Sequence, residues 1–339
     1  MAMSPQLKPY AVKLGFGESG TLARIFEILF DTGEKTLVAG AMPGSTSEIS
    51  GRTGIPEVRV REIIAELKRR GAVNHVLHKG DYYRLFPAMI ELRDSTVLSA
   101  GAPRELFQLW DSLIKNEMPA LLPVLKQLNI PPMMRVVPVE RTVDTSQRVL
   151  DVDSARKIIS DAQLISAVPC ACRTHARNVG RGKDCPAPET AVCLQVGAFA
   201  EAVLDRGIGE RLSVTEALRR LGDAEDAGLV HLVRNNIKKD MFLCNCCTCC
   251  CTGMYLITRV GYAESFAPSR FLSRLIAERC TACGLCESRC AFGAISLGAD
   301  GVPSIDRERC YGCGLCALHC PSDALVLDEI RPMESIRRT

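Results

Sequence analysis

The sequence predicts a protein of the α+β class with several domains. Apolar residues recur at helical spacing in the N-terminal third, and a four-cysteine pattern occurs twice near the C-terminus. The 18 cysteines are unevenly placed: residues 1–169 hold none, residues 170–251 hold ten and residues 280–320 hold eight. A chain of 339 residues is expected to form two or three domains, and this step in composition marks them.

The C-terminal cysteines have the spacing of iron–sulfur ligands. Each copy reads C-x-x-C-x-x-C-x-x-x-C; the first copy holds Cys280, Cys283, Cys286 and Cys290, and the second holds Cys310, Cys313, Cys316 and Cys320. Three thiolates separated by two residues each can hold one 4Fe–4S cluster, and the fourth ligates the other cluster. Structural zinc is the main alternative, but it usually shows two C-x-x-C pairs separated by a longer stretch. Disulfides fit less well, because cysteines this dense in a chain without an export signal are better ligands than bridges.

The repeat extends beyond the cysteines. Glu278-Arg279-Cys280 recurs as Glu308-Arg309-Cys310, and Gly284-Leu285-Cys286 recurs as Gly314-Leu315-Cys316. With these motifs, residues 268–330 resemble the bacterial two-cluster ferredoxins. The resemblance implies a small α/β fold with pseudo-two-fold symmetry and two 4Fe–4S clusters. It assigns Cys280, Cys283, Cys286 and Cys320 to the first cluster, and Cys310, Cys313, Cys316 and Cys290 to the second. Ala291 stands where the second copy has Pro321, a turn residue and not a ligand.

The N-terminal third shows the order helix, helix-turn-helix, hairpin. Helical spacing covers 22–29, a capping-box pattern starts a helix at Ser45, and Pro56 suits the first position of a helix that ends near Gly71. Residues 73–86 read as two strands around a Lys-Gly-Asp turn. This order resembles the winged-helix domains of bacterial regulators and implies a winged helix-turn-helix fold.

Two interpretations of this N-terminal domain stay open. The first is DNA binding, in which phosphates would be contacted by Arg52, Arg59, Arg61 and the cluster 68–70. The other is a solvated helix face, because glutamates alternate with the arginines along it. Winged helices also serve as docking or dimerisation modules, so a homodimer through this domain is a further expectation.

Residues 87–150 are expected to bridge the larger parts. Helices are predicted over 104–113 and 118–128, with Pro119 and Pro123 near turns, and a strand over 135–139. Trp110, the only tryptophan, is expected to pack in the core.

The middle of the chain carries the other ten cysteines. A helix is predicted over 152–167, a further capping box opens a helix at Ser213, and the block 244–251 is expected to form an irregular loop that gathers sulfur onto metal. The candidate metal ligands are Cys170, Cys172, Cys185, Cys193, Cys244, Cys246, Cys247, Cys249, Cys250 and Cys251. The C-x-C-R segment, a Gly-Leu-Val-His stretch and the C-N-C-C-x-C-C block resemble those of uncharacterised bacterial and archaeal iron–sulfur proteins over about residues 130–330, which implies no settled reaction.

The sequence leaves the cofactor of the middle domain open. Cys170, Cys172, Cys185 and Cys193 could form one site and Cys244, Cys246 and Cys247 with Cys249 or Cys250 another, but pairings across these groups are equally consistent. One or two further iron–sulfur clusters are expected, with zinc or a redox-active dithiol or persulfide as alternatives. His231 is either a ligand or a buried, hydrogen-bonded histidine. Arg173 lies either near a cluster or at the surface.

Composition narrows the classes of function. A net charge of +3 gives no bulk field for nucleic acid, and the N-terminus shows no signal peptide. No stretch reaches the length of a membrane span. Eighteen cysteines without an export signal predict a cytoplasmic, reducing setting, and oxygen-sensitive clusters would suit an anaerobe. The expected domains are a winged helix (1–90), a helical bridge (91–150), a cysteine-rich α/β metal or iron–sulfur domain (151–262) and a two-cluster ferredoxin domain (263–339).

These features predict an iron–sulfur electron-transfer protein or reductase subunit. Low-potential electrons would pass through the two clusters to the middle metal site and on to a redox partner protein or a substrate. Any enzymatic activity would be that of an oxidoreductase, with catalytic residues unknown. The alternatives are a redox-sensing winged-helix regulator that binds DNA, and a factor that delivers clusters or sulfur.

Overall fold

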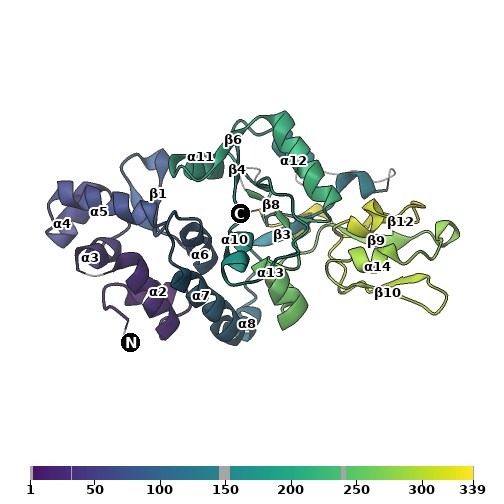
Figure 1. Ribbon diagram of the computed structural model, residues 1–339, viewed down its shortest axis with the longest axis horizontal. Helices are drawn as coiled ribbons and strands as arrows, with labels where there is room; N and C mark the ends of the chain where they lie inside the picture. The colour runs from purple at the N-terminus through teal and green to yellow at the C-terminus, as the bar shows by residue number, and fades with distance from the viewer. Residues whose placement is uncertain (1–2, 32, 145–152, 238–241, 339) are drawn as a thin grey trace. The chain divides into compact units, whose positions relative to one another are not determined.

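The computed structural model describes residues 3–31, 33–144, 153–237 and 242–338. The chain forms two compact units (Figure 1). The N-terminal unit comprises residues 1–128 and 171–181, and the C-terminal unit comprises residues 129–170 and 182–339. The finer division into four domains stays a prediction. Within the described residues, every helix is too short or too polar to span a bilayer.

The N-terminal unit is mainly helical. Its elements are α1 (Lys8–Lys13), α2 (Gly20–Phe30), α3 (Glu34–Gly40), α4 (Thr46–Thr53), α5 (Glu57–Arg69), β1 (Val73–His75), β2 (Tyr83–Leu85), α6 (Met89–Val97), α7 (Arg104–Ser112), α8 (Met118–Gln127) and α10 (Ala171–Asn178). Strands β1 and β2 pair antiparallel. The three predicted helices correspond to α2, α4 and α5, which precede the two-stranded sheet in the expected order, whereas α1 and α3 were not predicted. The winged-helix assignment itself stays a prediction.

Local signals set these helix ends. The capping box at Ser45 is confirmed, because the Ser45 hydroxyl accepts from the Glu48 amide and the Glu48 carboxylate accepts from the Ser45 amide. Pro56 is the N-cap of α5, one residue earlier than predicted. Pro123 lies inside α8, so the prediction that it lies near a turn is wrong. A π-helical segment, Leu113–Glu117, joins α7 directly to α8. Trp110 is fully buried, as predicted.

A six-stranded sheet organises the C-terminal unit. Its strands are β3 (Met134–Val137), β4 (Ile165–Val168), β5 (Cys193–Val196), β6 (Glu210–Leu212), β7 (Val230–Arg234) and β8 (Phe242–Cys246). They lie in the order β3-β7-β8-β5-β4-β6, with every neighbouring pair antiparallel. The single helix predicted over 152–167 is wrong in its second half. Helix α9 (Ala155–Ser160) ends before β4, whose four residues are all buried as a central strand requires.

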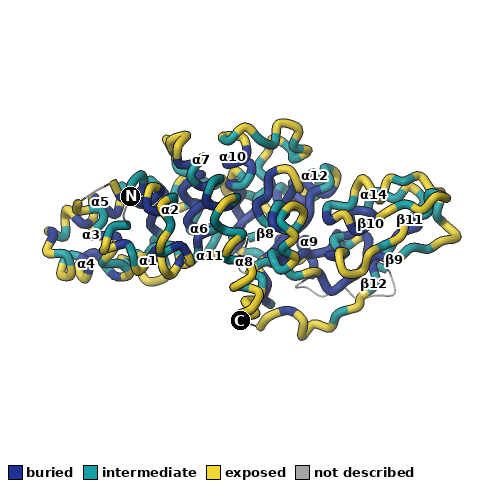
Figure 2. Tube along the Cα trace, turned by 90° about the horizontal axis from the view of Figure 1, so that it is seen from below, coloured by how far each residue is buried: buried dark blue, intermediate teal, exposed yellow. Residues whose placement is uncertain are grey.

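The two faces of this sheet differ in chemistry. One face forms an apolar core with α9 and α12 (Val214–Asp226), to which Leu194 and Leu243 contribute. Because side chains alternate along a strand, Cys193 and Cys244, one position away, lie on the opposite face. The sheet region near β8 is deeply buried (Figure 2). The prediction of an irregular loop from residue 244 is therefore wrong for Cys244–Cys246, which belong to β8.

The C-terminal module is built from two paired copies of one unit. Strand β9 (Phe271–Leu275) pairs with β12 (Leu325–Glu329), and β10 (Ile295–Leu297) pairs with β11 (Pro303–Ile305). Along the chain, short helices α14 (Leu285–Arg289) and α15 (Leu315–Leu318) each lie between the two strands of one copy; α14 is labelled in Figure 1. The first strand of one copy thus pairs with the last strand of the other, as pseudo-two-fold symmetry requires.

A buried ion network joins this module to the six-stranded sheet. The Asp153 carboxylate accepts hydrogen bonds from Arg135 Nη1 at 3.0 Å and from Arg270 Nε at 2.6 Å. Arg270 Nη1 also donates to Glu329 on β12 at 2.5 Å. Asp153 is fully buried and both arginines are 2% exposed. One carboxylate therefore balances cations from both parts of the unit.

We expect Asp153→Asn to lower the free energy of unfolding by about 3–5 kcal/mol, because it removes the buried carboxylate that Arg135 and Arg270 share and leaves Glu329 as the named carboxylate partner of Arg270 alone. Urea denaturation followed by circular dichroism measures this loss. The matched control is Asp328→Asn, which removes a solvent-accessible pair with Arg274 and should leave stability nearly unchanged. Equal losses in the two variants would contradict the role given to the buried network.

Candidate metal centres

The two cysteine loops of the C-terminal module have matching backbones. Each residue of the second copy follows its equivalent in the first by thirty positions, as Cys310 follows Cys280. Three equivalent pairs have positive φ: Ala282 and Gly312, Gly284 and Gly314, and Gly293 and Asp323. Each loop thus turns in the same way around its cysteines, so both copies present their sulfurs in equivalent positions.

The first loop and the end of the second share one cavity. It is lined by Cys280, Cys283, Cys286 and Cys320, together with the apolar side chains of Leu275, Leu285 and Leu325. Pairing of β9 with β12 brings Cys320 there, since Leu325 lies opposite Leu275. Four thiols around one apolar cavity fit the donor set of a 4Fe–4S cluster.

The second loop draws in the last cysteine of the first. Burial raises the pKa of Cys310 above its usual value, and the negative charge of a Cys290 thiolate raises it further. Burial also raises the pKa of Cys316 to about 12, with Cys310 and Cys290 adding to the effect. Thiolates this close are unfavourable without a cation, so a metal group is the natural partner of this set.

Backbone amides point at the crossing sulfurs. The Ala294 amide donates to Cys290 Sγ at 3.1 Å, and the equivalent Ala324 amide donates to Cys320 Sγ at 3.3 Å. Burial alone would raise the pKa of Cys320, but hydrogen bonds from the Ser322 amide and hydroxyl and from following amides lower it below its usual value. Hydrogen bonds to sulfur are a means by which proteins set cluster potentials.

The symmetric backbone has asymmetric surroundings. In the first loop Cys283 is exposed and Leu285 is 45% exposed. In the second loop Leu315, the equivalent of Leu285, is only 1% exposed. Cys316 is buried, whereas its equivalent Cys286 is partly exposed. Figure 2 shows α14 and the β10–β11 hairpin as mainly exposed or intermediate. The first cysteine loop therefore faces solvent and the second is covered.

Close backbone packing covers the second loop. A Cβ on Gly312 would lie 2.0 Å from the Phe271 carbonyl oxygen, and one on Gly314 would lie 2.3 Å from Thr142 Oγ1, so only glycine fits at both positions. The Val139 amide donates to the Cys313 carbonyl at 3.0 Å. Val139 and Thr142 lie in the segment that directly follows β3. The covered loop thus packs against the chain that leads out of the cysteine-bearing sheet.

Four cysteines of the middle domain lie together. The Sγ atoms of Cys185, Cys247, Cys249 and Cys250 are all within 4.8 Å of one another. Cys247 and Cys250 are buried, Cys185 is partly exposed and Cys249 is exposed. Hydrogen bonding to Cys247 and burial both raise the pKa of Cys250. This set combines Cys185, from the first suggested group of ligands, with three cysteines of the second group. Such a pairing across the two groups is one that the sequence left open.

The remaining middle cysteines lie elsewhere. Cys193 and Cys244 face each other across β5 and β8, with their Sγ atoms 4.0 Å apart. Cys246 ends β8, and Cys251 is the buried N-cap of α13 (Thr252–Tyr255). Cys170 follows β4 in the C-terminal unit, and Cys172 lies on α10 in the N-terminal unit.

A buried arginine contacts Cys172, which the sequence did not reveal. Arg93, on α6, is fully buried, and its Nη2 donates to Cys172 Sγ at 3.3 Å. Arg173 is 7% exposed, so of its two alternatives the surface position is wrong, and a position near a cluster stays a prediction. His231 is 1% exposed with its Nδ1 2.6 Å from Asn245 Oδ1, which confirms the buried, hydrogen-bonded alternative. The separation in sequence between Arg93 and Cys172 explains why no local pattern predicted their contact.

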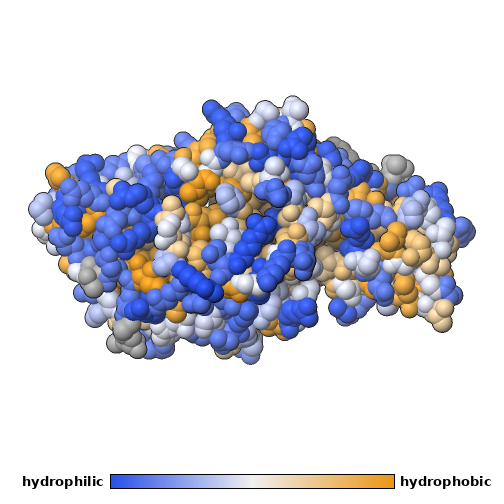
Figure 3. Space-filling view, viewed as in Figure 1, coloured by the Kyte–Doolittle hydropathy of each residue, from blue (hydrophilic) through white to orange (hydrophobic). Residues whose placement is uncertain are grey.

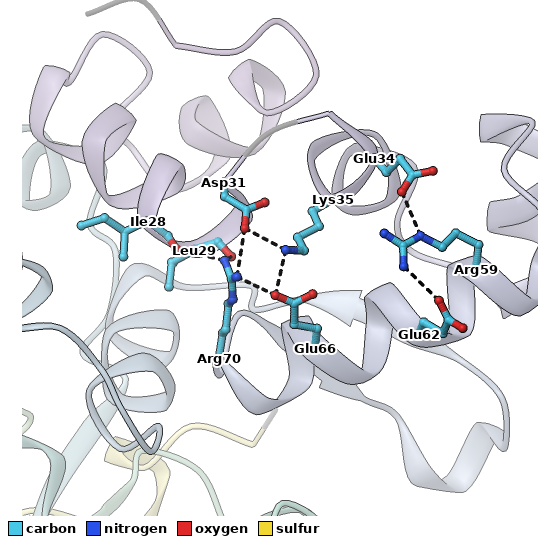
Figure 4. Close-up of polar contacts among 9 residues, drawn as sticks. All are labelled: Ile28, Leu29, Asp31, Glu34, Lys35, Arg59, Glu62, Glu66 and Arg70. Atoms are coloured by element: carbon cyan, nitrogen blue, oxygen red, sulfur yellow. Dashed lines mark hydrogen bonds and ion pairs between the residues drawn. The ribbon is translucent and has the colours of Figure 1, made fainter.

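Three of the six basic residues proposed to contact DNA, Arg59, Arg61 and Arg70, are paired with carboxylates; Figure 4 shows the pairs of Arg59 and Arg70. Arg59 donates to Glu34 and to Glu62, each at 2.9 Å. Arg70 binds Asp31 and Glu66, which also hold Lys35. Outside the figure, Arg61 pairs with Glu57 at 2.5 Å, and Arg52 Nη1 donates to the Ala41 and Pro43 carbonyls. These pairs offset the positive charge that phosphate binding needs.

Comparison with known proteins identifies the C-terminal module. The model of a family described as "4Fe-4S dicluster domain" matches residues 279–324, which include all eight module cysteines. Searches of curated proteins and of solved structures found no match. The chain therefore carries a 4Fe–4S dicluster domain beside a separate cysteine cluster, and together these indicate iron–sulfur electron transfer in general terms.

Two serines offer a test of the crossed ligand sets. Ser322 Oγ lies 3.7 Å from Cys320 Sγ, and Ser273 Oγ lies 3.4 Å from Cys316 Sγ. We expect Ser322→Ala to lower the potential of the cluster predicted to bind Cys280, Cys283, Cys286 and Cys320. Ser273→Ala should lower that of the other cluster. Loss of one hydrogen bond corresponds to about 20–60 mV for one electron.

Potentiometric titration followed by EPR measures both shifts, with Cys283→Ser identifying the first cluster by loss of its signal. Each serine variant serves as the control for the other. If Ser322→Ala instead shifted the signal that survives in Cys283→Ser, the crossed assignment would be wrong.

Proposed function

We propose that the chain is an electron-transfer protein or reductase subunit. It takes up low-potential electrons at the solvent-facing cysteine loop and passes them toward the cysteine-rich domain. Cys280, Cys283, Cys286 and Cys320 hold one 4Fe–4S cluster, and Cys310, Cys313, Cys316 and Cys290 hold the other. Clusters of this kind supply one-electron chemistry at potentials set by their surroundings. The match to the dicluster family carries this proposal.

The donor set supports the ligand assignment. Four cysteines of the first set line one cavity, and the thiols of the second set are close enough to raise one another's pKa. An apolar cluster that includes Ile295 and Leu325 packs against Cys286, Cys290 and Cys320. It keeps water from the space between the two sets and holds them at fixed separation.

The difference in exposure supports a direction of transfer. A redox partner reaches the first loop, where Cys283 and Leu285 are exposed. Apolar residues also appear on the visible surface over this module (Figure 3). The second loop is held against the segment after β3 by the Val139 amide and the close approach of Thr142. Electrons that enter at the first loop therefore leave on the side of the middle domain.

Binding of DNA is the weaker alternative for the N-terminal unit. The carboxylate partners of Arg59, Arg61 and Arg70 reduce the number of cations that phosphates would meet. A docking or dimerisation role, including a homodimer through this unit, is compatible with a surface that carries paired charges. Redox partner proteins are the partners that we propose.

We expect the module of the anaerobically purified chain to take up two electrons, one for each cluster, when titrated with a reduced viologen of low potential. Cys283→Ser should take up one electron fewer, because it removes a ligand of the exposed set. Leu285→Ala, in the same exposed loop but not a ligand, is the matched control and should take up both electrons. A chain with its full iron that accepts no electrons from low-potential reductants would refute the proposal.

A further inference from the structure

The four clustered cysteines of the middle domain are closer together than the ligands of a cubane need to be. Cys185 Sγ and Cys247 Sγ are 3.5 Å apart, and Cys249 Sγ and Cys250 Sγ are 3.6 Å apart. Four thiolates about 2.3 Å from one tetrahedral ion stand roughly 3.8 Å from one another. The sulfurs of a 4Fe–4S cluster bind four different irons and must stand farther apart than this.

The dicluster module provides an internal comparison. Among the described residues, this middle-domain set is the one group of three or more candidate ligands whose atoms lie within 4.8 Å of one another. The eight module cysteines, which match a cubane-binding family, form no group this tight within the same described part of the chain. The two kinds of site therefore differ in size, and the middle site is the smaller.

The spacing of the cysteines along the chain also favours a site smaller than a cubane. In the module, two residues separate successive cysteines of each loop, so each sulfur can reach a different iron. In the middle site one residue separates Cys247 from Cys249, and none separates Cys249 from Cys250. Consecutive Cα atoms are about 3.8 Å apart, which keeps the sulfurs of adjacent cysteines near one another when both face the same point.

The two segments that carry these cysteines have little regular structure to hold them together. Residues 182–192 contain no helix or strand, and residues 247–251 form the loop between β8 and α13. Cys185 belongs to the first segment and the other three to the second. An ion bound by both ties together two segments with little regular structure of their own, and its binding energy stabilises the folded unit.

We propose that Cys185, Cys247, Cys249 and Cys250 bind one tetrahedral ion, Zn²⁺ or a single iron without sulfide, and not an iron–sulfur cluster. Four protein thiolates leave no open position, as in closed structural sites. Either ion anchors the end of β8. Zn²⁺ has no redox chemistry and would carry no electrons, whereas a single iron would add a one-electron centre after the two cubanes. This inference deepens the proposed function, because it specifies the centre beside which the relayed electrons arrive.

The test is metal and acid-labile sulfide analysis of the full chain, purified anaerobically, with X-ray absorption at the edge of the additional metal. We expect about eight irons and eight sulfides from the module. We expect one further ion with four sulfur neighbours at about 2.3 Å and no iron neighbour. Zinc or iron at that ion distinguishes the two forms of the proposal, and both support it.

Three variants separate the sites. Cys185→Ser and Cys249→Ser should each lose the single ion and keep about eight irons; Cys249 is exposed, so its variant disturbs packing least. Cys193→Ser, on the adjacent strand but outside the set, should keep both. About twelve irons and twelve sulfides in the wild type, with four of each lost in Cys249→Ser, would overturn the proposal. A module with fewer than about eight irons would count instead against the proposed electron transfer.

Discussion

Neither copy of the C-terminal repeat forms a sheet by itself, and the module's other features follow from this constraint. Strand β9 needs β12 from the other copy, and β10 needs β11. The same exchange carries Cys320 into the cavity of the first loop and places Cys290 among the thiols of the second. The crossed ligation that we propose would therefore follow from strand pairing, and each metal group in turn would join the two copies.

Symmetry in the backbone is combined with asymmetry in the side chains. The two loops share their positive-φ positions, but the second has Gly312 where the first has Ala282, and Ala317 where the first has Glu287. Gly312 lets the second loop pack closely against the backbone of Phe271, where a Cβ would lie 2.0 Å from the carbonyl oxygen. A duplicated binding unit has thereby become a pair with one solvent-facing and one covered member, which is the arrangement that directional transfer needs.

Much of this account could be predicted from the sequence because its signals are local or periodic. The cysteine repeat, the capping box at Ser45 and the buried Trp110 depend on spacing or residue type. The sequence alone could not reveal contacts between residues that lie far apart along the chain. Examples are the balance of Asp153 between two arginines, the contact of Arg93 with Cys172, and the joining of Cys185 to the block after β8. Ser322, two residues from Cys320, carried a local signal that could have been found.

The helix predicted over 152–167 was wrong at β4 for a different reason. The helical pattern before it continues through small and apolar residues, so periodicity alone does not show where α9 stops. The structure ends the helix at Ser160 because residues 165–168 are needed between β5 and β6, where all four become buried. Tertiary pairing overrides local propensity there, and it also turns Cys244–Cys246 from the expected loop into a strand.

The central claim is that electrons enter at the exposed cysteine loop and move inward. The most direct measurement is rapid freeze-quench EPR during reduction by a protein-sized low-potential donor. We expect the signal lost in Cys283→Ser to appear first and the signal of the covered set second. We also expect reduction of the covered set to slow strongly in Cys283→Ser. A covered set that is reduced first, or at an unchanged rate in that variant, would contradict the proposed direction.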